Sequence, residues 1–253
     1  MNTIGKKIIV LLLCVFSFAA SHAAEFHNES LNYVVTYKWG LIHKDAGDAR
    51  LTLRNSGGKY QIVLTGKSKP WADKIYMVRD TLRCTINKNG FRPVRYEKAA
   101  HEKGKYSKDI INYGYSGGTT TASISRYKSK GGKIKTLKKN LSTNMQAFDM
   151  LSIFYYLRSL DYTRLKKGTI LKKAIFSGSQ KETITIKYIG LEPVTLRNKK
   201  KMNAYHIKFR FSTKGGKKSS DDMDTWISTD QSHIPLVLIG SLPVGQVRCY
   251  YIG

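Results

Sequence analysis

Residue types that commonly carry chemistry are scarce in this 253-residue chain, which has six histidines, three cysteines and only 17 acidic residues. The five histidines beyond residue 23 stand alone, without the His-x-His or His-Glu-x-x-His pairs that mark zinc sites. The sequence also lacks a Gly-x-Ser-x-Gly elbow and a Gly-rich loop followed by Lys-Ser/Thr. We therefore predict no metal and no cofactor, and we favour a protein that is not an enzyme.

Long apolar runs are also missing. The longest run, residues 8–20, has 13 residues, whereas a membrane-spanning helix needs about 20. Lys6 and Lys7 precede this run and Ser21-His22-Ala23 follows it, which is the three-part pattern of a cleavable secretory signal. We predict a signal peptide over residues 1–23 and an exported protein in the periplasm or at the cell surface, with an uncleaved anchor as the alternative.

Acidic residues are outnumbered by 44 lysines and arginines, so the formal net charge is +27, or +25 without the two lysines of residues 1–23. The positive charge is spread along the chain and is densest beside turns. Export argues against nucleic acid as the partner of this charge. An anionic lipid, lipopolysaccharide or an acidic glycan fits an envelope better, with peripheral membrane contact. The alternative is that the charge serves solubility alone.

Alternation of apolar and polar residues dominates the chain. In residues 31–39 the odd positions are Leu, Tyr, Val, Tyr and Trp, and similar runs recur as far as the C-terminus. This period is typical of antiparallel strands with one buried face. Paired glycines or Asn-Gly separate the runs, as tight hairpins require. No Gly/Ser-rich or Pro-rich linker interrupts them, so we predict a single β-rich envelope domain over residues 24–253.

One stretch has helical spacing instead. Met150, Ile153, Phe154 and Leu157 recur every three or four residues, and Asp149 can cap the first turn. A lone helix among many strands must bury its apolar stripe against them. The prediction is therefore a mainly β fold: a strongly curved antiparallel sheet, forming a half-barrel or open barrel, wrapped around one main α-helix at about residues 149–160. A closed barrel with the helix as a lid is the alternative.

Several short patterns together resemble an exported bacterial family catalogued as domain of unknown function 3108. The patterns are Leu31-x-Tyr33, Trp39-Gly40, Pro93-x-x-Tyr96, Asp149-x-Leu151-Ser152-x-x-Tyr155-Tyr156-Leu157-Arg158 and Trp226-x-Ser228-x-Asp230. The resemblance implies a periplasmic or surface protein of unsettled function. The many strands and single helix are also similar to the half-barrel of lipoprotein carriers, an analogy of fold alone.

The leading functional hypothesis is a non-catalytic envelope protein that binds an anionic lipid or glycan in the concavity of its curved sheet. Large side chains near the helix and at strand ends are the candidates for lining that concavity, and each could equally be plain core. They are Trp39, Trp71, Phe154, Tyr155, Arg158 and Trp226.

The acidic cluster Asp221-Asp222-x-Asp224 gives a second hypothesis, because three of the 17 acids fall within four residues. Asp224 and Asp230 could form the carboxyl pair of a hydrolase acting on acidic polysaccharide, with His233 as an acid/base partner. The alternative for the cluster is the polar entry of a hairpin, paired with nearby lysines. The alternative for Asp230 is that it caps its own turn. A third hypothesis is a structural partner in envelope assembly.

Two cysteines lie beyond the predicted signal, Cys84 and Cys249. An oxidising compartment would permit a disulfide between them, tying an early strand to the last one. The alternative is two buried thiols that behave as small apolar residues.

Overall fold

The computed structural model describes residues 25–213, 217, 220–241 and 245–253, so the predicted signal peptide lies outside the described residues. The described chain folds into one 15-stranded sheet in the order β8-β7-β6-β5-β4-β3-β2-β1-β15-β14-β13-β12-β11-β10-β9. Every pairing is antiparallel except that of β9 with β10. The prediction of a mainly β, strongly curved antiparallel sheet is confirmed.

The strands are β1 (Glu29–Trp39), β2 (Ile42–Ser56), β3 (Lys59–Ser68), β4 (Val78–Asn87), β5 (Pro93–Glu102), β6 (Lys105–Ser116), β7 (Thr119–Lys130), β8 (Lys133–Thr143), β9 (Ala147–Phe148), β10 (Ile170–Ser177), β11 (Gln180–Thr195), β12 (Lys201–Ser212), β13 (Met223–Ser228), β14 (Pro235–Ser241) and β15 (Gln246–Tyr251). Two short α-helices, α1 (Pro70–Tyr76) and α2 (Ser152–Arg158), and a 3₁₀ turn at Asn89–Phe91 complete the fold.

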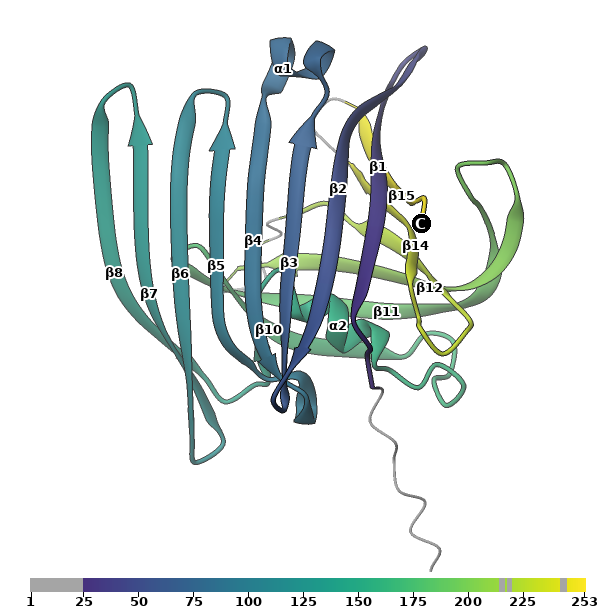
Figure 1. Ribbon diagram of the computed structural model, residues 1–253. Coiled ribbons are helices and arrows are strands. Elements are labelled where there is room, and N and C mark those ends of the chain that lie inside the picture. Colours follow the sequence, from purple (N-terminus) through teal and green to yellow (C-terminus); the bar gives the residue numbers. More distant parts are fainter. Residues whose placement is uncertain (1–24, 214–216, 218–219, 242–244) are drawn as a thin grey trace, which may run out of the picture.

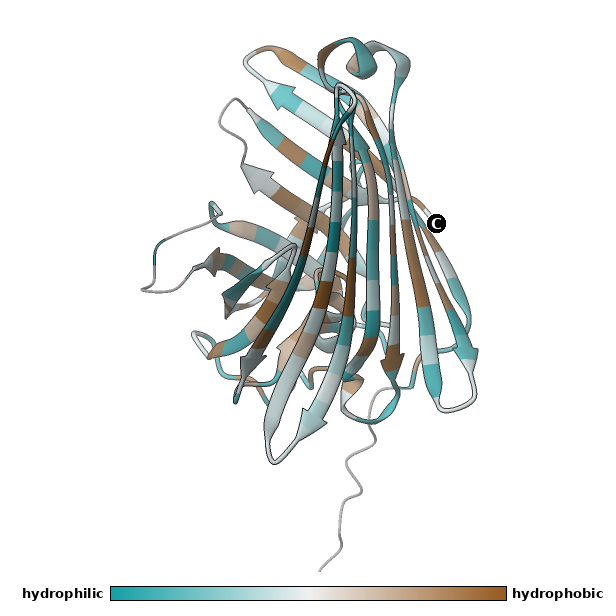
Figure 2. Ribbon diagram, turned by 90° about the vertical axis from the view of Figure 1, so that its left-hand side faces the viewer, coloured by the Kyte–Doolittle hydropathy of each residue, from teal (hydrophilic) through white to brown (hydrophobic). Residues whose placement is uncertain are grey.

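The sheet curls back on itself into a barrel-like shape (Figure 1). Strands β1 to β8 stand side by side as one wall, and β10 to β13 cross behind them as a second wall. Seen from the side, the two walls enclose a common interior (Figure 2). Strands β8 and β9 are the two edges of the sheet and do not pair with each other.

Around α2, the interior is filled by apolar side chains from both walls and from the helix itself. Leu31, Leu51 and Leu53 of the first wall belong to the same buried cluster as Ile186 and Ile207 of the second. The predicted alternation therefore has a physical basis, because residues two apart on a strand share a face. Helix α2 lies within this cluster, with Ile153, Tyr155 and Leu157 each at most 1% exposed.

The prediction of one main helix over 149–160 is wrong in the length of that helix and in the number of helices. Helix α2 spans seven residues, and α1 is equally long. Asp149 precedes α2, where its Oδ1 accepts hydrogen bonds from the backbone N–H groups of Leu151 (2.9 Å) and Ser152 (2.8 Å). Helix α1 starts at Pro70, which suits the first turn of a helix, but it buries only Ala72 and so lacks an apolar stripe.

A second, smaller core lies on the outer face of β1, β14 and β15, opposite the main core. Val34, Val237 and Tyr250 alternate along their strands with residues of the main core, and they pack against Val194 and Ala204. The last two residues belong to the distal half of the β11–β12 hairpin. A bulge between Tyr188 and Gly190 bends this hairpin, so that its distal half, residues 190–204, covers the outer face of β1 and of β13 to β15. We call this segment the hairpin arm.

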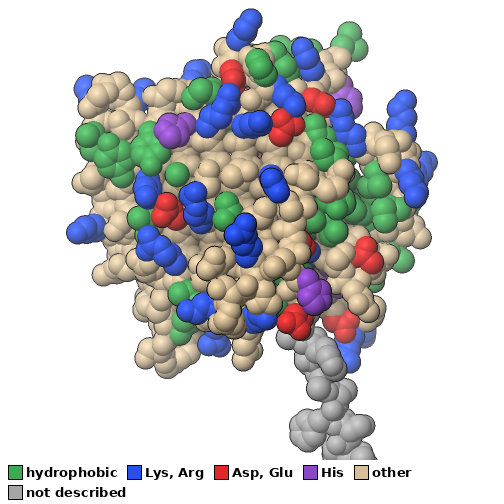
Figure 3. Space-filling view, in the orientation of Figure 1, with side chains coloured by type: hydrophobic (Ala, Val, Ile, Leu, Met, Phe, Trp, Pro, Cys, Tyr) green, Lys and Arg blue, Asp and Glu red, His purple; other side chains and the backbone are tan. Residues whose placement is uncertain are grey.

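Lysine and arginine side chains are scattered over the face shown in Figure 3 and gather at its upper end. No helix in the described part of the chain has the length and apolar composition needed to cross a membrane.

Candidate functional site

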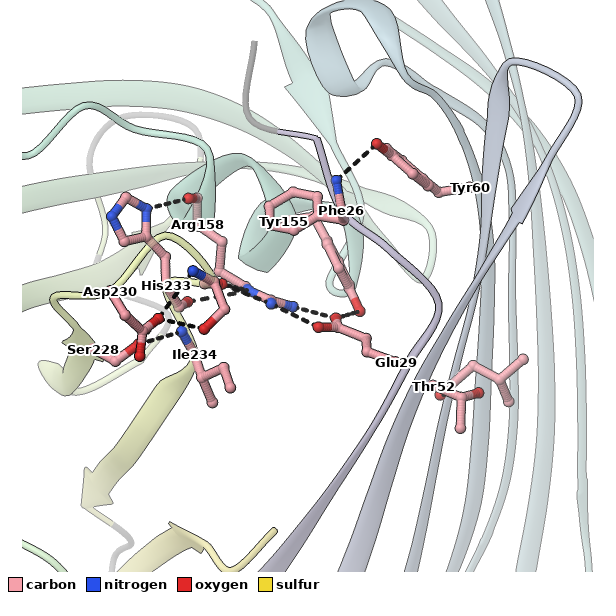
Figure 4. A network of polar contacts seen from close by, with 12 residues as sticks. Phe26, Glu29, Thr52, Tyr60, Tyr155, Arg158, Ser228, Asp230, His233 and Ile234 are labelled. Atoms are coloured by element: carbon pink, nitrogen blue, oxygen red, sulfur yellow. Dashed lines mark hydrogen bonds and ion pairs between the residues drawn. The ribbon is translucent and has the colours of Figure 1, made fainter. Parts of the chain in front are cut away.

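Arg158 is one of the fully buried side chains that the sequence singled out. It ends α2, is fully buried, and forms a bidentate ion pair with Glu29 of β1 at 2.5 and 2.9 Å (Figure 4). Its guanidinium also donates to the carbonyl oxygens of Ser232 (2.8 Å) and His233 (3.1 Å). Burial alone would lower the pKa of Arg158, but its bonds with Glu29 outweigh burial and the pKa is raised.

Aromatic rings complete the surroundings of Arg158. Its guanidinium carbon lies 4.6 Å from the ring centre of Phe26 and 4.9 Å from that of Tyr155. The Tyr155 hydroxyl donates to Glu29 at 2.9 Å. Both Tyr155 and Arg158 are 0% exposed, so these two candidates are enclosed by protein rather than facing an open concavity.

Asp230 and His233 form the turn between β13 and β14 that meets this network. Asp230 accepts from the Ser232 N–H at 2.9 Å and from the Ser228 hydroxyl at 3.1 Å. Nδ1 of His233 lies 2.7 Å from the carbonyl oxygen of Arg158. Asp230 therefore caps its own turn, and the imidazole of His233 is directed at the end of α2 (Figure 4).

Asp224 lies on β13 in a different cluster, centred on His206. The His206 ring has Asp224 2.7 Å from its Nε2 and Glu192 of the hairpin arm 2.7 Å from its Nδ1, the second contact lacking hydrogen-bond alignment. Trp226 stacks on the imidazole at 4.3 Å and donates its indole N–H to Glu192 at 3.2 Å. The carboxylates of Asp224 and Asp230 thus have separate partners and do not face a shared space.

The sequence pointed to Asp224 and Trp226 but missed His206 and Glu192, because the four residues come from three strands. Their arrangement fastens the hairpin arm to the main sheet. Within the described part of the chain, no group of three or more His, Cys, Asp or Glu side chains could hold a metal ion.

One pocket of the described interior lies beside the helix and is very small. The pocket that Leu160, Tyr162 and Tyr188 line has a volume of about 10 Å³, which is at the lower limit for one water molecule. Phe154 is partly buried and packs edge-on against Phe209 with ring centres 6.3 Å apart. The face that the sequence suggested as a concavity is filled by α2.

The upper part of the inner face is charged instead of apolar. Lys98 of β5 lies between Asp80 (3.5 Å) and Glu102 (3.2 Å), and Arg126 of β7 lies 3.0 Å from Asp109. Burial raises the pKa of Asp109 despite the nearby Arg126. These residues were not among the predicted candidates, although their alternating positions on neighbouring strands could have suggested a shared face.

One hollow lies outside the sheet, where the β1–β2 hairpin, α1 and the hairpin arm meet. It has a volume of about 540 Å³, and we call it the Trp71 cleft. The β1–β2 hairpin, the start of α1 and the tip of the hairpin arm supply its lining: Thr36, His43, Lys44, Asp45, Lys69, Trp71 and Arg197, with Pro70.

Side-chain contacts fix the walls of this cleft. The Trp71 indole N–H donates to the Asp45 carbonyl oxygen at 2.7 Å, and the Lys44 ammonium lies 5.0 Å from the Trp71 ring centre. Arg197 reaches from the arm to the Asp45 carboxylate at 2.6 Å. Lys69 pairs with Asp48 at 2.7 Å. The lining thus carries three permanent cations and a single carboxylate, which favours an anionic ligand.

Trp39 lies apart from the cleft lining. It is 54% exposed at the end of β1, next to the turn of the β1–β2 hairpin. The six side chains that the sequence suggested as ligand contacts are therefore distributed over four surroundings. These are the hairpin tip (Trp39), the outer cleft (Trp71), the interior (Phe154, Tyr155 and Arg158) and the arm contact (Trp226).

Cys84 and Cys249 are both free, so the structure does not contain the disulfide that the sequence suggested. Cys84 on β4 donates its S–H to the buried carboxylate of Asp149 at 3.1 Å. Cys249 is on β15, and three strands separate β15 from β4 in the sheet. Burial raises the pKa of the Cys84 thiol well above its ordinary value and that of Cys249 to about 11.

The chain is a barrel-like β protein whose interior is packed around α2, and a hollow lined by three cations lies on its outer surface. Residues 32–250 match the family described as "Protein of unknown function (DUF3108)", and the chain belongs to this family. The resemblance noted in the sequence is thereby confirmed. No curated protein matches the chain.

Among solved structures, the chain is similar to the "Beta-barrel-like Protein of Domain of Unknown Function DUF1849 from Brucella abortus". The two share 10% sequence identity, the match covers 91% of this chain and 98% of the other, and the TM-score is 0.58. At this identity the likeness supports the fold alone.

We predict that Glu29→Gln lowers the free energy of unfolding by about 3 kcal/mol, because it leaves the fully buried Arg158 charge without its counter-ion. Urea unfolding followed by fluorescence measures the change. Asp161→Asn is the control, since it removes a solvent-exposed ion pair and should leave the transition where it is. Equal transitions for Glu29→Gln and wild type would contradict a structural role for the pair.

We also predict that Cys84 and Cys249 resist alkylation at pH 8 in the folded protein and react once urea unfolds it. For Cys249, a pKa of about 11 leaves roughly a hundredth of the thiolate present at the ordinary value of 9.0. Peptide mapping by mass spectrometry identifies each labelled cysteine. If labelling in urea required a reductant, the two thiols would be bridged instead of free.

Proposed function

We propose that this chain is an exported envelope protein without catalytic activity, and that it binds the anionic group of an envelope lipid or acidic glycan in the Trp71 cleft. The anionic group would be a phosphate or a carboxylate. The observation that carries the proposal is the convergence of Lys44, Lys69 and Arg197 around a hollow of about 540 Å³.

The division of charges within the cleft favours recognition of an anion. Asp45 and Asp48 already have Arg197 and Lys69 as partners at 2.6 and 2.7 Å. Lys44, by contrast, lies over the Trp71 ring and has no ion pair with an acid in the described residues. Its ammonium is therefore available to a ligand, and Trp71 and Pro70 supply an apolar surface beside it.

The cleft also moves the proposed site from the concave face of the sheet to its outside. A lipid chain inside the sheet would have to displace α2 and the side chains packed around it. The outer cleft accepts a head group or a sugar without such a rearrangement.

Export is supported by the signal-like pattern of residues 1–23 and by the strongly basic composition of the rest. A polysaccharide hydrolase has less support, because Asp224 and Asp230 are engaged with different partners. A carboxyl pair for glycoside cleavage needs both groups at one sugar.

The experiment compares binding of two soluble probes by isothermal titration calorimetry. Dihexanoyl phosphatidylglycerol, kept below its micelle-forming concentration, represents a lipid head group, and oligogalacturonate represents an acidic glycan. We expect Lys44→Ala combined with Lys69→Ala to weaken the preferred probe at least about tenfold, because a charge-assisted bond contributes about 1.5–3 kcal/mol.

Lys138→Ala on the edge strand β8 is the matched control, since it removes an exposed lysine far from the cleft in the sheet order. It should bind like the wild type. Binding that survives the double substitution, or equal affinity for a neutral probe such as dihexanoyl phosphatidylcholine, would contradict the proposal. The probe that binds more tightly distinguishes a lipid from a glycan.

A further inference from the structure

The two ends of the first wall differ in how many apolar side chains their turns expose. Because β1 to β8 are consecutive and antiparallel, every second connection lies at the same end. Four connections therefore share one end: turn 40–41, helix α1, turn 103–104 and turn 131–132. Figure 1 shows them along the upper edge of the wall, and we call them the upper rim.

Exposed apolar side chains are concentrated on the upper rim. Leu41 is fully exposed, and Trp39 and Ile42 on either side of the turn are 54% and 44% exposed. Ile75 of α1 is 66% exposed, and Ile134, just after turn 131–132, is 61% exposed. The opposite end of the same wall has Tyr115 and Met145, each only 38% exposed. Apolar exposure at one end of a wall indicates a contact surface.

Lysines surround these apolar side chains. Exposed lysines on the rim are Lys38, Lys44, Lys74, Lys103, Lys105, Lys130 and Lys133. The acidic residues nearby already have basic partners: Asp73 pairs with Arg79 at 2.7 Å, and Glu102 pairs with Lys98 at 3.2 Å. The rim therefore presents an excess of positive charge, in agreement with the basic upper end visible in Figure 3.

We propose that the upper rim docks on a membrane surface containing anionic phospholipid, with Trp39, Leu41 and Ile42 inserted at the boundary between head groups and acyl chains. Tryptophan favours that boundary because its ring is apolar and its N–H is polar. Lysines that reach past an apolar patch keep their ammonium groups among the lipid phosphates. Each such lysine raises membrane affinity roughly fivefold.

The shape of the rim favours a lipid surface over a protein partner. Its apolar groups are carried on the tips of separate turns, whereas a protein interface presents a continuous, closely packed patch. A fluid surface of head groups can accommodate separate tips. The proposal goes beyond the Trp71 cleft, because it rests on Trp39, Leu41 and Ile42, which do not line that cleft.

The test is co-sedimentation with vesicles of phosphatidylcholine alone or with 30% phosphatidylglycerol, using protein purified from its own cells with its N-terminus determined by mass spectrometry. All variants are compared with the same N-terminus. We expect wild-type protein to prefer the anionic vesicles and Trp39→Ser combined with Leu41→Ser to bind them at least about tenfold more weakly. Ile170→Ser, which alters an apolar residue on β10 that is 56% exposed, close to the 54% of Trp39, should bind like the wild type.

Fluorescence quenching distinguishes insertion of Trp39 into the bilayer from electrostatic attraction to its surface. Lipids brominated near the head group should quench Trp39, and Trp39→Phe should lose that quenching while still binding. The combined change Lys103→Ala, Lys130→Ala and Lys133→Ala should weaken binding to the vesicles with phosphatidylglycerol. Binding to the vesicles of phosphatidylcholine alone should stay the same.

The outcomes also separate this docking from the cleft proposal. The Trp39/Leu41 variant should still bind dihexanoyl phosphatidylglycerol like the wild type, because it leaves the cleft intact. Vesicle binding that the Trp39/Leu41 variant retains in full would overturn the docking, even if the cleft binds its probe. The docking proposal would also be overturned if wild-type protein bound neither kind of vesicle, or if the rim bound an envelope protein instead.

Discussion

The bidentate pair between Arg158 and Glu29 is the interaction on which the arrangement of the two walls depends. It joins the end of α2 to the first strand across 129 positions of sequence, and the same guanidinium holds the β13–β14 turn through Ser232 and His233. A buried pair contributes little net stability once desolvation is counted, but its loss leaves a costly unpaired charge. We therefore expect the pair to act mainly by excluding other placements of the helix.

This constraint explains why the predicted concavity is absent. Fixed to both walls, α2 presents Tyr155 and Leu157 to the interior, and side chains from opposite strands close around it. Open space suitable for a ligand is then found outside, where the bent hairpin arm meets the β1–β2 hairpin and α1. The bulge next to Gly190 is as important for the cleft as the residues that line it, because it brings Arg197 to Asp45.

Local patterns in the sequence predicted local structure well. Alternation located most of the strands, although not β8 or β9. Asp149 was expected to cap the first helical turn, and it accepts hydrogen bonds from the N–H groups of Leu151 and Ser152. Partners far apart in sequence could not be predicted: Glu29 stands in an ordinary alternating strand, and nothing near it points to Arg158. Helix α1 was missed because its one buried residue gives no periodic signal. Among the cleft residues only Trp71 was proposed, because three distant segments create the site and no single segment contains it.

Exposed lysines have different surroundings on β8 and on the upper rim. Edge strand β8 exposes lysines on both of its faces, and such charges discourage pairing with another sheet. That explanation suffices for β8, where most exposed side chains are polar. It does not account for the upper rim, where lysines accompany Trp39 and a fully exposed Leu41. Solubility alone gives no reason for exposed apolar groups to lie beside these cations, and the proposed docking on an anionic membrane would use both.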